Sequence, residues 1–327
     1  DGEYDQAREY FNREVSIAQA NFGDEHVRTA VALLNLGGTL RRLGEYQLAI
    51  GEMLRAKKIL ESLSTEGSQQ LVALAVNLGN TYRDIGNLNE ASDVYEAGLA
   101  RSATEGGDQR HRAFLLNNSG ELLYDRGFVT QCNDRLEQAL QLKIQIMGPD
   151  HPSTARTMLL LARAQLASGN ISVAKSWIDK AEKLYLNQYG AEHNRMAFWE
   201  LTNGMYMHAI NAAAGARPWL DRGVDHRMAA YNAQHIDVVS AALLLARLET
   251  STQNLDRARY WLSVATPGIE LLNTAQLERI EAAIVTAELL TAEGREAAGN
   301  SATVQALALV EQHFPDRRDW RDRLTQL

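Results

Sequence analysis

Compact side chains recur along this chain at a nearly constant interval of 41 or 42 residues. This row comprises Ala7, Ala49, Ala91, Cys132, Ala174, Ala216 and Ala258. A second row with the same period comprises Gly37, Gly79, Gly120, Ala162, Gly204 and Ala246. A third, of bulky apolar residues, comprises Phe11, Met53, Tyr95, Leu136, Ile178, Leu220 and Leu262. Such a period, held over most of a 327-residue chain, predicts a repeat protein whose units bury their apolar faces against each other.

Residues 77–99 show what one repeat contains. Leu78 and Tyr82 belong to an apolar stripe with a four-residue step, which predicts one helix. Gly86 then interrupts the pattern, as is common where a left-handed residue ends a helix. Ala91 and Tyr95 belong to a second amphipathic helix. One repeat is therefore expected to be an antiparallel helix pair.

The small residues explain how the two helices of a pair pack. Gly79 and Ala91 have little or no side chain, so the two backbones can approach closely where they cross. Tyr95 is expected to fill the space beside this contact. A larger residue in either small row should force the helices apart, at a typical overpacking cost of about 1–3 kcal/mol.

Helix breakers divide the chain into repeats. They lie at Gly2, Gly44, Gly86, Gly127, Gly169, Asn211 and Gln253. Residues 1–266 are expected to form the array: the second helix of a truncated repeat, then about six repeats, with the fifth and sixth degenerate. Pro267-Gly268 predicts a stop, and residues 267–327 an off-register helix pair and a capping helix. Because the chain starts within a repeat, we expect it to be a piece of a longer or processed protein.

The order of small, glycine, tyrosine and alanine positions resembles the tetratricopeptide repeat (TPR), as in NLGNTYRDIGNLNEASDVYEAGL (77–99) and NLGGTLRRLGEYQLAIGEMLRA (35–56). The usual period is about 34 residues. The longer period and the linkers FGDEHVRTA and MGPDHPSTA are similar to the kinesin light chain-like subtype found in bacterial regulatory proteins. The resemblance implies an all-α fold, a right-handed superhelical solenoid of antiparallel helix pairs. In such a solenoid the first helix of each pair, called a first helix below, lines the concave groove.

The composition and the missing motifs argue against several classes of protein. The net charge is −8 with both signs interspersed, which disfavours nucleic-acid binding. No window approaches 18 consecutive apolar residues, so we expect no membrane span. The single Cys132 lies in the small row and is interpreted as a packing residue rather than a reactive thiol, which fits a reducing, cytoplasmic location. Nucleophile, phosphate-loop and metalloprotease motifs are missing from the sequence, so we expect neither an enzyme nor a cofactor.

Four histidines precede first helices: His26, His151, His193 and His235. A metal site would need several of them about 2 Å from one ion. Consecutive linkers of a solenoid are instead roughly 10 Å apart. We therefore expect no metal site and interpret the histidines as parts of helix starts, most clearly at His151, where Pro152 suits the first helical position.

Asparagines recur on the first helices although asparagine is a mediocre helix former. Asn35, Asn77 and Asn118 are in register, and Asn80 and Asn117 lie close to them. By the resemblance these amides face the groove, where an amide can pair with the backbone of an extended peptide. The alternative is a structural bond between the first helices of consecutive repeats. Both interpretations stay open here.

Charged and aromatic residues share the groove-facing phase. Together with the asparagines, the candidate peptide contacts are Arg42, Arg83, Glu121, Tyr124, Arg156 and Arg163. The arginines suit acidic side chains or a C-terminal carboxylate, or else are solvated residues near helix ends. Further along, Leu201, Met205 and Leu243 are expected to make the groove more apolar.

The function that these features favour is a non-catalytic scaffold that binds a protein or peptide in its groove. One alternative is the ligand-sensing part of a larger signalling protein, such as a kinase, a STAND-type ATPase or a peptide-pheromone-type regulator, although no helix-turn-helix motif is visible. Another is a structural module that self-associates through its truncated N-terminal end, where Ala7 and Phe11 would lack a partner helix.

Overall fold

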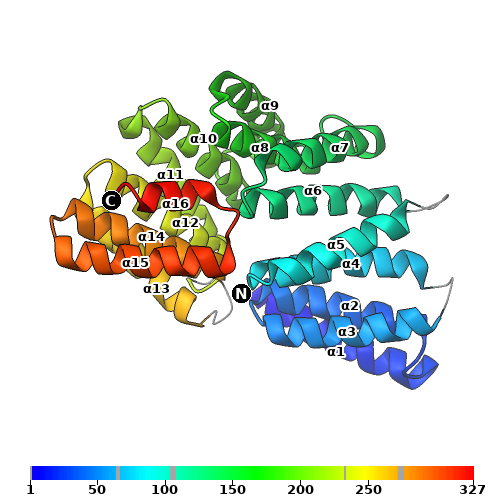
Figure 1. Cartoon of the computed structure of the whole chain (residues 1–327). Coiled ribbons are helices and arrows are strands. Elements are labelled where there is room, and N and C mark those ends of the chain that lie inside the picture. The colour runs from blue at the N-terminus through cyan, green and yellow to red at the C-terminus, as the bar shows by residue number, and fades with distance from the viewer. Residues whose placement is uncertain (1, 64–66, 104–107, 232, 272–275) are drawn as a thin grey trace. The chain divides into compact units, whose positions relative to one another are not determined.

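The computed structural model describes residues 2–63, 67–103, 108–231, 233–271 and 276–327 (Figure 1). Within these ranges the secondary structure is helical throughout. The elements are α1 (Gly2–Phe22), α2 (Val27–Arg42), α3 (Tyr46–Ser62), α4 (Ser68–Asp84), α5 (Leu88–Ser102), α6 (Gln109–Asp125), α7 (Val129–Met147), α8 (Pro152–Ala167), α9 (Ile171–Tyr189), a 3₁₀ turn η1 (Asn194–Met196), α10 (Ala197–Ala209), α11 (Ala213–Ala230), α12 (Ile236–Ser251), α13 (Leu255–Leu271), α14 (Gln276–Ala292), α15 (Glu296–His313) and α16 (Arg318–Leu324).

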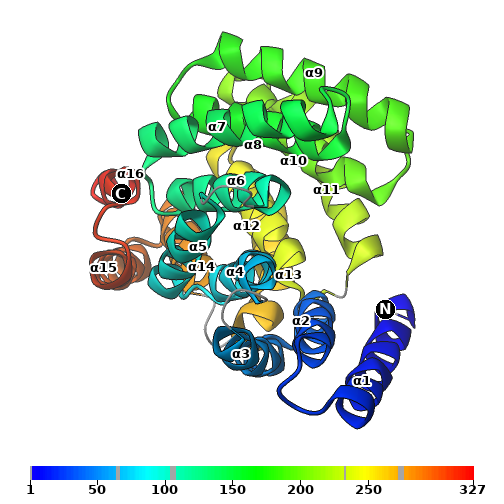
Figure 2. The ribbon, with the colours of Figure 1, turned by 90° about the vertical axis from the view of Figure 1, so that its right-hand side faces the viewer.

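The helices form two compact units, residues 1–122 and residues 123–327. Within the first unit, α2 packs on α3 and α4 on α5, and α2 also contacts α4. Figure 2 shows α2 between α1 and α4. Within the second unit, the pairs are α8 with α9, α10 with α11, α12 with α13 and α14 with α15. The predicted all-α solenoid of helix pairs is confirmed, while its right-handed superhelical sense stays a prediction.

The small residues lie where the paired helices meet, as predicted. Ala91 and Tyr95 are fully buried. A Cβ placed on Gly79 would lie 2.3 Å from the Tyr95 ring, and one on Gly204 would lie 2.3 Å from Leu220. Because real Cβ atoms do not approach other atoms so closely, a larger residue at either position would force its neighbour to shift. The same close approach therefore holds a helix pair together in each unit.

The breaker positions end the first helices in one recurring conformation. A positive φ is found at Gly44, Gly86, Gly127, Gly169, Asn211 and Gln253, and again at Gly294. The next residue donates its N–H to a carbonyl five positions back, as Asn87 does to Tyr82 at 2.8 Å. This is the bond that defines a Schellman helix end. The predicted breaker row is thus confirmed from Gly44 to Gln253, including the two non-glycine positions.

The linker histidines cap helices. Nδ1 of His151 accepts the N–H of Ser153 at 3.1 Å, and Pro152 follows as the first helical residue. His26, His193 and His235 make the equivalent bond to the residue two positions on. The structural interpretation of these histidines is confirmed. In the part of the chain described here, no three His, Cys, Asp or Glu side chains are grouped so as to hold a metal ion.

The helix end expected at Pro267-Gly268 is not observed, because α13 continues through Pro267 to Leu271. Proline removes only its own N–H from the last turns of the helix. Gly268 lets these turns pack closely, since a Cβ there would lie 2.4 Å from Val239 on α12. Tight packing on α12 thus extends the helix past two residues that usually terminate one.

Candidate binding site

In the first unit, two first-helix arginines are paired with carboxylates of the next repeat. Arg83 on α4 forms an ion pair of 3.2 Å with Glu121 on α6. Arg41 on α2, which the sequence analysis did not single out, pairs with Asp84 on α4 at 2.7 Å. Both pairs join consecutive first helices. Arg83 and Glu121 therefore neutralise each other on this face.

The asparagines of this unit are bonded in the same way. Nδ2 of Asn118 on α6 donates to Oδ1 of Asn80 on α4 at 2.8 Å, and the Tyr95 hydroxyl donates to the same oxygen at 2.6 Å. Burial raises the pKa of Tyr95, so its hydroxyl stays a donor. Asn117 donates to Asn118 at 3.2 Å. The bond between Asn118 and Asn80 links one first helix to the next, which is the arrangement that the structural alternative describes.

Three further predicted residues lie on the first helices of the first unit without linking them to each other. Asn77 donates to the carbonyl of Ala73, one turn back in α4, at 3.3 Å. Asn35 and Arg42 on α2 are exposed to solvent. Asn35 and Arg42 are therefore accessible for contact with another molecule, and Asn77 is partly exposed.

The predicted residues of the second unit come together around aromatic rings. The Arg163 guanidinium on α8 lies 5.3 Å from the centre of the Phe198 ring on α10 and 5.9 Å from that of Tyr124 on α6. Arg156, two turns earlier on α8, lies 4.5 Å from Phe198. Attraction between a cation and the face of a ring holds such side chains in place. The structure thus joins Tyr124, Arg156 and Arg163 into one cluster.

Arg163 differs from Arg41 and Arg83 of the first unit in its ion pairing. Its Nε is buried and has no hydrogen-bond partner. Among the described residues it forms no ion pair with a carboxylate, so its positive charge is not neutralised within this unit. A buried donor left unsatisfied costs about 1–3 kcal/mol. Arg163 is partly exposed, and its guanidinium has no carboxylate partner of its own among the described residues.

Phe198, which completes this cluster, was missed in the sequence analysis. The repeat phase could have identified it, because Phe198 lies 42 residues after Arg156 and so occupies the same position of the repeat.

Two apolar residues that were expected to line the groove lie in the hydrophobic core instead. Leu243 is fully buried and Leu201 is 7% exposed, both within the hydrophobic core of the second unit. They cannot line a groove because they pack between helices.

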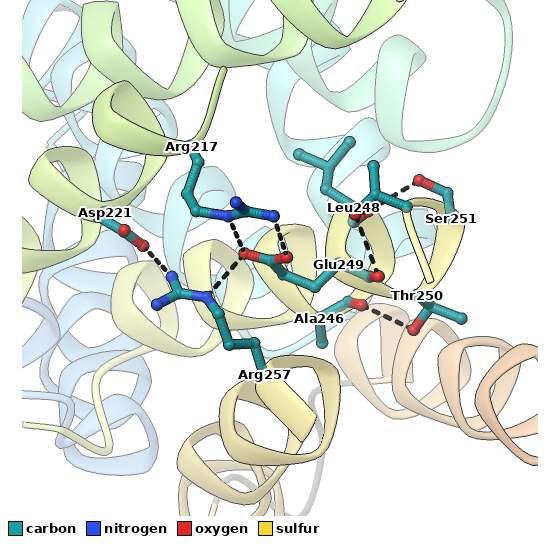
Figure 3. Close-up of polar contacts among 9 residues, drawn as sticks. Arg217, Asp221, Ala246, Leu248, Glu249, Thr250, Ser251 and Arg257 are labelled. Carbon is teal, nitrogen blue, oxygen red and sulfur yellow. Dashed lines mark hydrogen bonds and ion pairs between the residues drawn. The ribbon is translucent and has the colours of Figure 1, made fainter. Parts of the chain in front are cut away.

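A second polar cluster, also missed from the sequence, joins α11, α12 and α13 (Figure 3). The Glu249 carboxylate accepts two bonds of 2.9 Å from Arg217 and one of 2.8 Å from Arg257. Arg257 also donates to Asp221 at 2.5 Å. Burial would raise the pKa of Glu249, but the two arginines outweigh it and lower the pKa. Each charge here has its partner, so we interpret this cluster as a structural tie between three helices.

A family model described as tetratricopeptide repeat matches residues 1–62, 33–104 and 111–187. These segments cover more than half of the chain and reach into both units. Among the described residues, no helix combines the length and apolar character needed to cross a membrane.

The matching curated proteins are longer than this chain. Human tetratricopeptide repeat protein 23 is 23% identical over 217 residues, which is 65% of this chain and 48% of that protein. A human clustered mitochondria protein homolog is 28% identical over 89 residues, or 27% of this chain and 7% of that protein. The chain therefore spans about half or less of the length of these relatives.

Several solved structures have a similar fold. The Rap conjugation gene regulator of plasmid pLS20, in complex with the Phr* peptide, has a TM-score of 0.67 at 13% identity, with 88% of this chain and 75% of that chain covered. A Rap protein complexed with Competence and Sporulation Factor has a TM-score of 0.66 at 11% identity, with coverages of 100% and 98%. The apo quorum sensor NprR from B. thuringiensis has a TM-score of 0.61 at 17% identity, with coverages of 82% and 72%.

Proposed function

The chain belongs to the tetratricopeptide repeat family, and from that premise we propose that it is a non-catalytic module that binds an extended peptide or protein segment. The fold supports this, because the similar Rap structures hold a Phr* peptide or Competence and Sporulation Factor. A stiff array of helix pairs presents fixed contacts, so little of its own conformational freedom is lost on binding. In this proposal the peptide binds on the face formed by the first helices.

The observation that carries the proposal is the unpaired Arg163 guanidinium between Phe198 and Tyr124. A carboxylate accepts two parallel bonds from such a fork, and these charge-assisted bonds are roughly twice as strong as neutral ones. The adjacent Arg156 adds positive charge. We therefore propose that a peptide carboxylate, either an acidic side chain or the C-terminus, binds at Arg163.

The remaining candidate residues divide into two groups. Asn35, Arg42 and Asn77 are proposed as additional peptide contacts on the first unit, since they do not link consecutive first helices. The others we assign to holding those helices together, because each bonds to the neighbouring first helix or to a residue that does: Asn80, Arg83, Asn117, Asn118 and Glu121.

A peptide library tests this function directly. Random pentapeptides are prepared in three sets: with a free C-terminal carboxylate, as C-terminal amides, and as amides with a central aspartate. We expect binding of the first or third set by the wild-type protein and at least a tenfold loss in Arg163→Gln. Arg163→Lys, which keeps the charge without the fork, should recover part of it. Arg13→Gln, an exposed site on α1, is the matched control.

Failure of all three sets to bind would reject peptide binding by this chain. Binding that is equal in Arg163→Gln and wild type would reject the site. A preference for the free carboxylate over the amide identifies the C-terminus as the bound group, whereas a preference for the aspartate set identifies an acidic side chain.

A regulatory role within a larger signalling protein is a finer form of the same proposal. The similarity in fold to regulators of the Rap type and to the quorum sensor NprR favours it. A cytoplasmic location belongs to this form. Sequencing the full reading frame tests it: an adjoining kinase, ATPase or DNA-binding module supports the role, and a frame without any effector module argues against it.

Self-association through α1 is a second candidate function. Tyr10 and Ile17 lie seven residues apart on one side of α1 and are 66% and 57% exposed. Large apolar side chains exposed together favour contact with another surface. Light scattering over a concentration series should show a dimer in the wild type and a monomer in Tyr10→Ser with Ile17→Ser. A wild-type monomer at all concentrations would reject this function.

A further inference from the structure

Arg317, in the linker between α15 and α16, joins two distant parts of the second unit. Its Nη1 donates to the carbonyl oxygen of Asp125 at 2.9 Å, across a sequence separation of 192 residues. Asp125 is the last residue of α6, where the second unit begins. The C-terminal segment thus holds the helix end at the opposite end of the same unit.

The Arg317 side chain is fixed from its own segment as well. Nε and Nη2 donate to the two oxygens of Asp319 at 2.8 and 2.7 Å. The guanidinium lies 3.8 Å from the centre of the Trp320 ring, and Trp320 is buried. Burial would raise the pKa of Asp319, but the bond and charge of Arg317 outweigh it and lower the pKa. All three nitrogens of the fork are therefore engaged, and the side chain is preorganised toward α6.

Gly127 has no side chain that would collide with Arg317. Its φ of +84° is one that L side chains rarely adopt, and a Cβ there would lie 2.6 Å from Cδ of Arg317. Gly169 offers a comparison within the same unit, because its φ is +75° but a Cβ would meet nothing within 4 Å. The two positions share the conformational demand for glycine and differ in the contact with Arg317.

The turn that Arg317 grips also carries Tyr124. The N–H of Gly127 donates to the carbonyl of Tyr124 at 2.9 Å, so both belong to the same helix end. The Tyr124 ring lies beside the Arg163 guanidinium, which is 5.9 Å from the centre of the ring. A shift of the turn would move one wall of the Arg163 cluster.

We propose that Arg317 is a positioning residue that holds the end of α6, and with it Tyr124, in place beside Arg163. The docked segment 314–327 is then part of the binding apparatus although it does not touch the ligand. The effect on ligand affinity rests on the proposed peptide-binding function. The effect on the helix end does not, and can be measured without ligand.

Two matched pairs of full-chain variants test this. Arg317→Gln is compared with Arg318→Gln, an exposed arginine of the same segment. Gly127→Ala is compared with Gly169→Ala, which shares the left-handed strain without the clash. Amide hydrogen exchange is measured without ligand for residues 123–129 and 314–327. Affinity is measured with the free-carboxylate and aspartate pentapeptide sets.

We expect Arg317→Gln and Gly127→Ala to speed exchange in both segments at least fivefold over their controls, and to weaken pentapeptide binding three- to tenfold. Unchanged exchange at 123–129 in Arg317→Gln would overturn the proposal, whatever the affinity. Faster exchange with unchanged affinity would overturn the positioning role. If the wild type binds no pentapeptide, the proposed function fails, and the exchange data still decide whether Arg317 holds α6.

Discussion

The first-helix faces of the two units use one repeat position in opposite ways. Asn80 and Glu121 in the first unit have the same phase as Arg163 in the second. Asn80 and Glu121 bond to the neighbouring first helix, through Asn118 and Arg83. Arg163 instead lies between aromatic rings with its Nε unbonded. A repeat phase therefore determines which face a side chain occupies, but the neighbouring repeat decides whether that side chain is bonded to another polar group or packed between rings.

The difference arises at one position of the repeat, which changes from arginine to tyrosine between consecutive repeats. Tyr124 has the phase of Arg83, so the position that supplies the cation in the first unit supplies a ring in the second. Arg83 forms an ion pair with Glu121. Tyr124 instead packs its uncharged ring against the Arg163 guanidinium and supplies no counterion for the positive charge. The comparison predicts that a substitution of Arg83 changes stability, whereas a substitution of Arg163 changes ligand affinity.

The largest expected effect concerns a buried acid of the second unit. Glu278 accepts a bond of 3.0 Å from Ser240, and burial, with Glu281 and Asp125 adding to it, raises its pKa to about 8. As the pH rises from about 4.5 to 8, the folded state keeps a proton that the unfolded state has lost, so stability falls. Glu278→Gln should remove this slope and add about 2–4 kcal/mol to the free energy of unfolding at pH 8.

Urea unfolding of both proteins between pH 5 and 9 measures this. Stability curves that converge at pH 5 and separate toward pH 9 are expected. Parallel curves would contradict the assignment of a buried neutral acid to the second unit, in contrast to the paired Glu121 of the first.

The second-largest expected effect tests the close approach of paired helices, which both units share. Gly79→Ala and Gly204→Ala should each lower the free energy of unfolding by about 1–3 kcal/mol, because the new Cβ would lie 2.3 Å from Tyr95 or Leu220. Gly38→Ala is the control, since its nearest neighbour would be Asn77 at 3.7 Å. Alanine there should gain up to about 1 kcal/mol in helix propensity. A loss confined to one unit would show that the helix pairs pack differently.

A smaller effect separates stability from binding. Arg163→Gln should lower affinity for the carboxylate-bearing pentapeptides about tenfold, or about 1.4 kcal/mol, and change the free energy of unfolding little. Arg83→Gln should do the reverse and cost about 1 kcal/mol of stability, since it leaves Glu121 without its ion pair. Calorimetric titration and urea unfolding of both variants measure the two quantities. Equal losses in both quantities for both variants would remove the distinction between the units.

The smallest effect falls on the amide pair of the first unit. Asn118→Ala removes the bond to Asn80 and should cost about 0.5–1.5 kcal/mol of stability with unchanged pentapeptide affinity. Thermal unfolding and titration of the variant decide the matter. An affinity loss at unchanged stability would instead assign the asparagines to ligand contact.

Most of the fold could be predicted from the repeat period, because helix pairs, helix ends and caps depend on residues that are close together in the sequence. The left-handed residue at Gly86, the close approach at Gly79 and the cap at His151 each depend on residues within a few turns of the chain. The α13 end was predicted four residues too early, because packing on α12 overrode the local signal of Pro267.

The site was predicted only in part, because partners across repeats depend on how helices stack. The sequence placed Tyr124, Arg156 and Arg163 on one face, and the repeat phase was sufficient to add Phe198. The contact of Arg317 with Asp125 spans 192 residues and has no periodic signal. Neither the pairing of Arg83 nor the isolation of Arg163 follows from phase alone.

The most direct test of the central claim is the location of the ligand footprint. Hydrogen exchange is compared with and without the pentapeptide set that binds. The account predicts slower exchange in α8 and α10, around Arg163 and Phe198, with the protection lost in Arg163→Gln. Protection confined to α2 and α4, and unaffected by Arg163→Gln, would contradict it.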